Sequence, residues 1–173
     1  DEKRPVIYYS LTRSLDIMPG KITFRGLLRY SKLNEYERTV ILIIDEIYVS
    51  KRIEYSGGEY IGLTSDGKVA STMVCFMVKS LAGSYKDLVG IYPISNLTAS
   101  KLYSCYLEVL DIIEKVKFNL VAIVVDNATV NRKFFKDFLC EGDLKSTITN
   151  SKTGKPIFLL FDPVHNLKNI YNN

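Results

Sequence analysis

The sequence predicts an α/β fold with a mixed five-stranded sheet, three antiparallel strands followed by two parallel ones, flanked by helices. Two nearly continuous apolar runs, residues 40–49 and 119–126, have the length and β-branched composition of buried strands, and each carries an aspartate. Between them, residues 98–117 repeat apolar side chains at helical spacing. With 173 residues and 47% apolar content, the chain is long enough to bury one core, so we expect a single domain.

The first half of the chain is predicted to be an antiparallel meander. Residues 40–49 (VILIIDEIYV) form the first strand, and residues 52–55 and 60–63 form a hairpin around Gly57 and Gly58. Residues 69–78 follow the turn at Ser65-Asp66-Gly67 as another strand.

The second half is predicted to alternate helices and strands, as a parallel crossover requires. The helix over residues 98–117 has Thr98 or Ser100 available as its cap. A helix capped by Asn127 or Thr129 follows the strand at 119–126. Residues 144–155 are predicted to be a polar loop, and residues 157–161 a strand. A last helix is predicted to begin at Asp162-Pro163.

This element order is that of the RNase H-like fold, although the pattern alone leaves other three-layer α/β folds open. Residues 1–38 are predicted to be an N-terminal extension with a helix near 23–30, and residues 39–173 the core. The two ends are abrupt, which suggests a fragment of a longer protein.

Composition excludes several classes of protein. The net charge is only +4, which permits nucleic-acid binding without arguing for it. Cys75, Cys105 and Cys140 are widely spaced and odd in number, which argues against a zinc ribbon or a disulfide framework. No long apolar run or signal peptide occurs, so we expect an intracellular protein without a membrane partner.

Asp45 and Asp126 are the candidate metal ligands and catalytic residues. The first strand should pair in parallel with the strand at 119–126, which would bring the two carboxylates within a few ångströms. Two such carboxylates repel each other unless a cation lies between them. Mg²⁺ or Mn²⁺ suits hard oxygen ligands and supports phosphodiester substitution, so the chemistry implied is cleavage or transfer at phosphorus.

Each acid also has a structural interpretation. Asp45 would be a solvent-facing or salt-bridged acid, but its apolar neighbours suggest burial, which is costly for an unpaired carboxylate. Asp126 would be a helix cap. Glu46 should point to the opposite face of its strand from Asp45, as a structural or supporting acid.

The last part of the chain adds candidates for support and for nucleic-acid binding. Asp162 and His165 would project from the same sheet edge, yet Asp162 fits helix capping equally well and a lone histidine is usually a packed or surface residue. Basic side chains are frequent there and form either a solvated face or contacts to phosphates. They are Arg132, Lys133, Lys136, Lys145, Lys152, Lys155 and Lys168, of which Arg132, Lys133 and Lys168 are the candidate nucleic-acid ligands.

At the strings LIIDEIYVSKRIEY, VAIVVDNATVNRKFF and LLFDPVHNLKNIYNN the chain resembles the P-element transposase family, including its THAP-domain relatives. The resemblance implies an RNase H-like DDE nuclease that acts in the nucleus, cutting and joining transposon DNA ends with magnesium. By motif match, Asp45 and Asp126 take the first two catalytic acid positions, and Asp162 and His165 fall on a DxxH-like element that helps arrange the scissile strand.

The resemblance also implies parts that this chain lacks. The third catalytic acid, a glutamate, would lie beyond a nucleotide-binding insertion, with GTP as the nucleotide, and both fall after Asn173. The zinc-binding DNA-recognition domain and the zipper-like segment that supports homo-oligomers are also missing. We therefore expect this chain alone neither to cut DNA at a useful rate nor to select a sequence.

Two other functions stay open at this point. A domesticated copy would keep the fold as an inactive interaction or DNA-binding module. An RNase H-like ribonuclease or exonuclease would need further acids, for which Glu46, Glu141 and Asp143 are the spare candidates.

Overall fold

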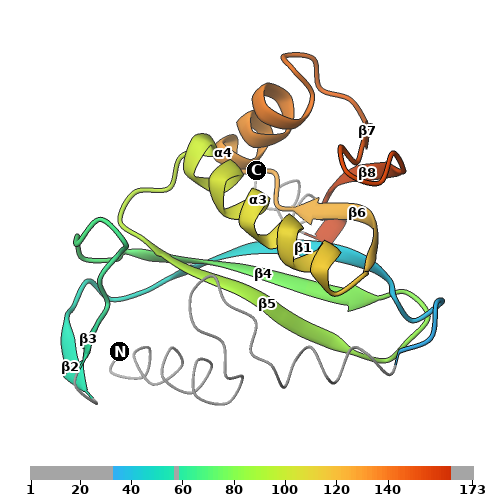
Figure 1. Cartoon of the computed structure of the whole chain (residues 1–173). Coiled ribbons are helices and arrows are strands. Elements are labelled where there is room, and N and C mark those ends of the chain that lie inside the picture. The colour runs from blue at the N-terminus through green and yellow to red at the C-terminus, as the bar shows by residue number, and fades with distance from the viewer. Residues whose placement is uncertain (1–32, 57–58, 165–173) are drawn as a thin grey trace.

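A six-stranded mixed sheet forms the centre of the molecule (Figure 1). The computed structural model describes residues 33–56 and 59–164. The strand order is β5-β4-β1-β6-β8-β7, with β1 parallel to β6, β6 parallel to β8, and the other neighbours antiparallel. The strands are β1 (Thr39–Tyr48), β4 (Thr72–Ser80), β5 (Lys86–Ile94), β6 (Asn119–Val125), β7 (Thr147–Thr149) and β8 (Pro156–Phe161).

The predicted fold class is confirmed, since the mixed sheet, its parallel β1–β6 pair and its flanking helices are all present. The β-branched run of β1 forms a central strand, and every second residue from Val40 to Ile44 is fully or almost fully buried. These buried side chains mark the face of the sheet that the helices cover.

Helix α3 (Ala99–Lys115) covers this face of the sheet (Figure 1). Its cap is Thr98, as predicted, and the Thr98 hydroxyl accepts a hydrogen bond from the Lys101 amide at 3.3 Å. Leu102, Tyr106 and Leu110 recur at helical spacing and are buried against the sheet, so α3 is held mainly by its apolar stripe.

The segment after β6 folds into α4 (Thr129–Lys133), which continues as the π-helix η1 (Phe134–Leu139). Phe134 and Phe135 are fully buried, and Phe134 packs edge-on against Tyr106 of α3 with 5.6 Å between ring centres. The predicted caps Asn127 and Thr129 are wrong, because the structure places the cap at Ala128.

Strand β5 was not predicted, because Gly90 and Pro93 interrupt its apolar pattern. Gly90 is required by packing: a Cβ there would lie 3.0 Å from Cγ2 of Val109 on α3 and 2.9 Å from Cε2 of Tyr92. Pro93 is tolerated because β5 is an edge strand. The third antiparallel strand of the sheet is therefore β5.

The predicted hairpin forms a sheet of its own. Strands β2 (Glu54–Ser56) and β3 (Glu59–Ile61) pair only with each other and project beyond the end of the main sheet (Figure 1). The segment 144–155, predicted to be loop, contributes the short edge strand β7, which makes the sheet six-stranded instead of five-stranded.

Three sequence predictions lie outside the described residues: the helix near 23–30, His165 and Lys168. The last helix does begin at Pro163. No helix in the described part of the chain is long and apolar enough to cross a lipid bilayer.

Candidate active site

Two of the three neighbouring parallel strands, β6 and β8, are directly followed by an aspartate, and β1 carries Asp45 three residues before its end. The β1–β6 register pairs Ile43 with Val124, and extending it by two residues sets Asp45 opposite Asp126. The β6–β8 register pairs Val125 with Phe161, so the next residue along β8 is Asp162. The Asp162 amide donates to the Val125 carbonyl at 2.7 Å, which continues the ladder to this point.

Side chains directly opposite each other on paired strands share a face, and neighbouring strands lie about 4.8 Å apart. The paired residues end at Ile43 and Val124, so the register places Asp45 and Asp126 on the same face only if it continues for two more residues. That the two carboxylates meet stays a prediction.

Asp45 is exposed, which contradicts the expectation that it is buried. The covered part of β1 ends at Ile44, and the strand then continues past the core, so Asp45, Ile47 and Tyr48 all reach solvent. Its Oδ1 accepts from the Glu46 amide at 2.9 Å. The metal hypothesis thus loses its burial argument and depends on the register.

The Asp45 carboxylate influences the strand beside it. Cys75 of β4 lies directly opposite Asp45 and is 4% exposed. Burial raises the pKa of the Cys75 thiol to about 11, and the negative charge of Asp45 contributes to that rise. The Asp45 side chain therefore lies on the face of the sheet that α3 does not cover.

Asp126 has a structural role in the turn that leads from β6 into α4, two residues before the Ala128 cap. Its Oδ1 accepts from the Ala128 amide at 2.9 Å and from Nδ2 of Asn131 at 2.6 Å, which fixes the start of α4. Asp162 repeats the first of these contacts, since its Oδ1 accepts from the Val164 amide at 2.9 Å. Both aspartates thus begin a helix at the end of a parallel strand.

Glu46 faces the other way, as predicted from strand alternation. Its Oε1 accepts from the Thr72 hydroxyl at 2.9 Å, on the same side of β1 as buried Leu42 and Ile44. Sequence reasoning missed two polar partners, Thr72 of Glu46 and Asn131 of Asp126. Of these, only Asn131 gave a local signal, because it stands five residues after Asp126 on the helix that the aspartate begins.

Asp45 and Asp126 could hold a divalent cation only together with further ligands. Oδ2 of Asp45 and Oδ2 of Asp126 have no hydrogen-bond partner among the described residues, so each carboxylate presents one unengaged oxygen. Within residues 33–56 and 59–164, no group of three or more His, Cys, Asp or Glu side chains is arranged to hold a metal. Asp162, although it is next in the row, does not complete such a group.

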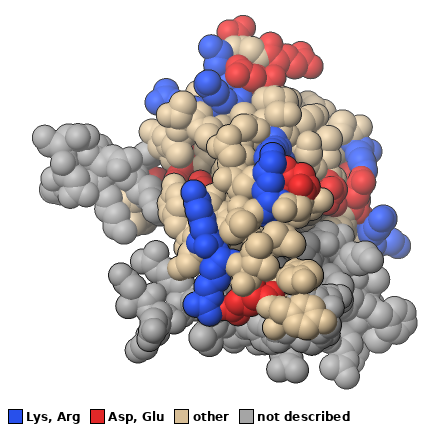
Figure 2. Space-filling view, turned by 90° about the vertical axis from the view of Figure 1, so that its left-hand side faces the viewer, with Lys and Arg blue, Asp and Glu red and all other residues tan. Residues whose placement is uncertain are grey.

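The basic candidates that the structure describes are Arg132 and Lys133, both exposed at the end of α4. They follow Asp126 by six and seven residues, on the helix that this acid precedes. On the face of the molecule in Figure 2, basic and acidic side chains are interspersed, with no continuous basic patch. That face therefore matches a solvated surface better than a broad DNA-binding surface.

A family model described as "TNP-like, RNase H N-terminal domain" matches residues 23–139. The chain belongs to this family. The match includes Asp45, Asp126, Arg132 and Lys133, and it begins inside the segment predicted as an N-terminal extension. The boundary between residues 38 and 39 stays a prediction.

Among solved structures, the chain is similar to the Drosophila P element transposase in a strand transfer complex, with a TM-score of 0.69 and 20% identity. The similarity covers 98% of this chain and 37% of the transposase chain, so this chain spans just over a third of that protein's length. At this identity the likeness shows a shared fold. No curated protein matches the chain.

Together with the family match, this similarity establishes a relationship to the P-element transposase family. The resemblance in the three sequence strings is thereby confirmed.

Proposed function

We propose that Asp45 and Asp126 jointly bind a divalent cation, Mg²⁺ or Mn²⁺, in the catalytic core of a transposase-derived protein that cleaves and joins DNA. The observation that supports this proposal is the parallel β1–β6 pair, whose register, continued for two residues beyond Ile43 and Val124, would set the two carboxylates opposite each other. Carboxylates so close favour a shared cation because their charges otherwise repel.

The chemistry follows from the donor set. A bound divalent cation would stabilise the charge that develops on phosphate oxygens during phosphodiester substitution. Asp45 and Asp126 would each contribute one carboxylate oxygen to hold it, and the Asn131 amide would orient Asp126 through the bond to Oδ1. A third acid from outside these residues would complete the set.

DNA is the proposed substrate because the related solved structure is described as a transposase strand transfer complex. Arg132 and Lys133 are proposed to contact phosphates beside Asp126, since they are exposed on the helix that this acid begins. Lys168 is proposed to contact phosphates as well, and Asp162 and His165 are proposed to support the active site. A nuclear location and a homo-oligomeric, GTP-dependent full-length protein complete this proposal.

A second candidate function is a DNA-binding or interaction module without catalysis. The observation that favours it is the structural role of Asp126 at the start of α4, where its Oδ1 already accepts two hydrogen bonds. An acid kept for that role alone would persist after catalysis was lost. The two functions differ in whether Asp126 also binds a cation.

The experiment is a calorimetric titration of the chain with Mn²⁺, repeated with Asp45→Asn and Asp126→Asn. We expect binding that either variant weakens at least about tenfold, as loss of a charged ligand predicts. Asp137→Asn is the matched control, because Asp137 is an exposed aspartate on η1. Absence of binding, or equal binding by all variants, would favour the non-catalytic module.

A further inference from the structure

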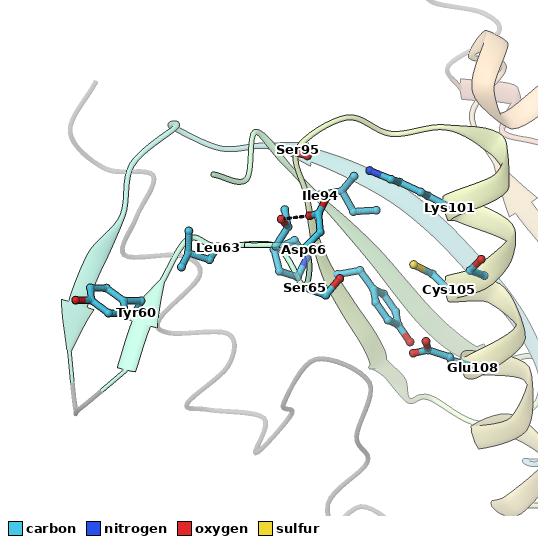
Figure 3. A pocket seen from close by; sticks show the side chains of 13 residues that line it. Tyr60, Leu63, Ser65, Asp66, Ile94, Ser95, Lys101, Cys105 and Glu108 are labelled. Atoms are coloured by element: carbon cyan, nitrogen blue, oxygen red, sulfur yellow. Dashed lines mark hydrogen bonds between the residues drawn. The ribbon is translucent and has the colours of Figure 1, made fainter. Parts of the chain in front are cut away.

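Strands β4 and β5 are buried on both faces of the sheet. On one face, Ile94 of β5 lines a cleft together with Lys101 of α3 (Figure 3). On the opposite face, Met73, Cys75 and Ile91 form a small apolar group, the β4–β5 cluster, and all three are buried. Because α3 covers only the first face, another part of the protein must bury the second.

The neighbouring strands do not explain this burial. Ile91 belongs to β5, an edge strand, yet it is completely buried, whereas Ile41 and Ile43 on the same face of central strand β1 stay partly exposed. An edge residue has a strand on one side only, so without a covering layer it should be the more exposed. Among the described residues, only Val49 and Leu88 pack against the cluster, and both lie beside it along the strands. A segment must therefore lie over the cluster.

The position of the cluster indicates which segment this is. The burial is that of one chain alone, so the cover belongs to this chain. Residues 165–173 follow β8, and a segment from there would cross Phe158 and Leu160 first, which are about half exposed. Residues 57–58 are too few. Residues 1–32 join the described chain at Leu33, near the start of β1 and next to β4.

Within that segment, residues 23–32 have a suitable sequence and length. Phe24, Leu27 and Leu28 recur at the spacing of one helical face. The family match also begins at this point of the chain. Ten residues span about 15 Å as a helix and up to about 35 Å when extended. Cys75 lies about 20 Å along the sheet from the start of β1, which is within this reach.

We propose that residues 23–30 cover the β4–β5 cluster as an apolar layer, with Phe24, Leu27 and Leu28 as the side chains that contact it. Asp45 lies directly opposite Cys75 and is exposed, so the layer ends between β4 and β1 and lies beside Asp45. The segment is thus part of the folded core and borders the candidate metal site. This inference depends on burial alone and holds whether or not Asp45 binds a cation.

The direct test is methyl NMR of the full chain with labelled isoleucine and leucine methyl groups. We expect nuclear Overhauser contacts between the Ile91 methyl groups and those of Leu27 or Leu28, because packed side chains approach within about 4.5 Å. Contacts of Ile91 with its neighbours in the sheet alone, or with residues before 23, would overturn the proposal.

Two variants measure the cover through the Cys75 thiol. Leu27→Asp should raise the rate at which maleimide modifies Cys75 at least about tenfold, because a buried leucine is replaced by a charge. Arg25→Asp is the matched control, since it introduces the same side chain on the other side of the predicted helix and should leave the rate unchanged.

Peptide mass spectrometry reads each cysteine separately, and Cys140, buried in the main core, reports global unfolding. If Leu27→Asp does not fold, Leu27→Ala replaces it, with a smaller increase expected at Cys75. Equal rates at Cys75 in the leucine variant and in Arg25→Asp would contradict the proposal.

Discussion

The two faces of the sheet differ in what they contribute. Under α3 and η1, residues such as Leu42, Ile123 and Ile157 are completely buried in one apolar cluster. On the opposite face, burial is uneven: Cys75 and Ile91 are buried in a second small cluster, whereas Phe158 and Leu160 of β8 are 51% and 47% exposed and Asp45 reaches solvent. Because side chains alternate along a strand, neighbouring residues serve stability on one face and are available for binding on the other.

The largest predicted effect compares two phenylalanines. Phe134→Ala, on the covered face, should cost about 3–5 kcal/mol of unfolding free energy, because it leaves a cavity between α3 and η1. Phe158→Ala, on the open face, should cost less than about 1.5 kcal/mol, since half of its side chain is already exposed. Urea denaturation measures both, and similar costs would mean that the two faces are not distinct.

The second prediction concerns the close contact of β5 with α3. Gly90→Ala should lower the unfolding free energy by about 1–3 kcal/mol through overpacking. The new Cβ would lie 3.0 Å from Cγ2 of Val109 and 2.9 Å from Cε2 of Tyr92, and both distances are shorter than ordinary van der Waals contact. Gly90→Val should cost more. Thermal unfolding of both variants tests this order, and a neutral Gly90→Val would show that α3 does not approach β5 as closely as described.

The third prediction separates the structural role of Asp126 from metal binding. Asn131→Ala removes the 2.6 Å bond to Asp126 Oδ1 and should cost about 1 kcal/mol of stability. Mn²⁺ should still bind through Oδ2, with an affinity within about tenfold of the original, as for loss of a supporting contact. Calorimetry on the folded variant measures this. Complete loss of Mn²⁺ binding would mean that Asn131 shapes the site itself.

The smallest effect is a pH dependence at Cys75, which is buried on the face of the sheet that α3 does not cover. The pKa of Cys75 is raised from its ordinary 9.0 to about 11 by burial and by Asp45. The neutral thiol therefore stabilises the fold fully below pH 9, and this contribution is lost as the pH rises from about 9 to 11. Asp45→Asn should lower the titration midpoint.

Thiolate absorbance, taken as the difference between each protein and its Cys75→Ser counterpart, gives that midpoint directly. An unchanged midpoint in Asp45→Asn would show that the two side chains do not interact across the β1–β4 pair.

Local patterns predicted the elements that carry strong periodicity. The β-branched runs of β1 and β6 and the helical spacing of α3 were sufficient to place these elements, and the predicted parallel β1–β6 pair is present. The convergence of Asp45 and Asp126 at its end stays a prediction. Strand β5 was not predictable, because Gly90 serves a tertiary contact with Val109 that no local pattern records.

The environment of the acids was less predictable than their position. Asp45 has apolar neighbours in sequence, yet it lies on the face of β1 that α3 does not cover, so its exposure is a tertiary outcome that the local sequence does not record. The separate hairpin of β2 and β3 was likewise predicted as strands, but its exclusion from the main sheet is a tertiary outcome.

The central claim is that Asp45 and Asp126 share a cation. The most direct measurement is an anomalous difference map from crystals of this chain soaked in Mn²⁺. We predict a peak between the two carboxylates, within about 2.5 Å of one oxygen of each, as expected for hard-cation ligation. A peak that touches neither aspartate, or none at saturating Mn²⁺, would contradict the claim.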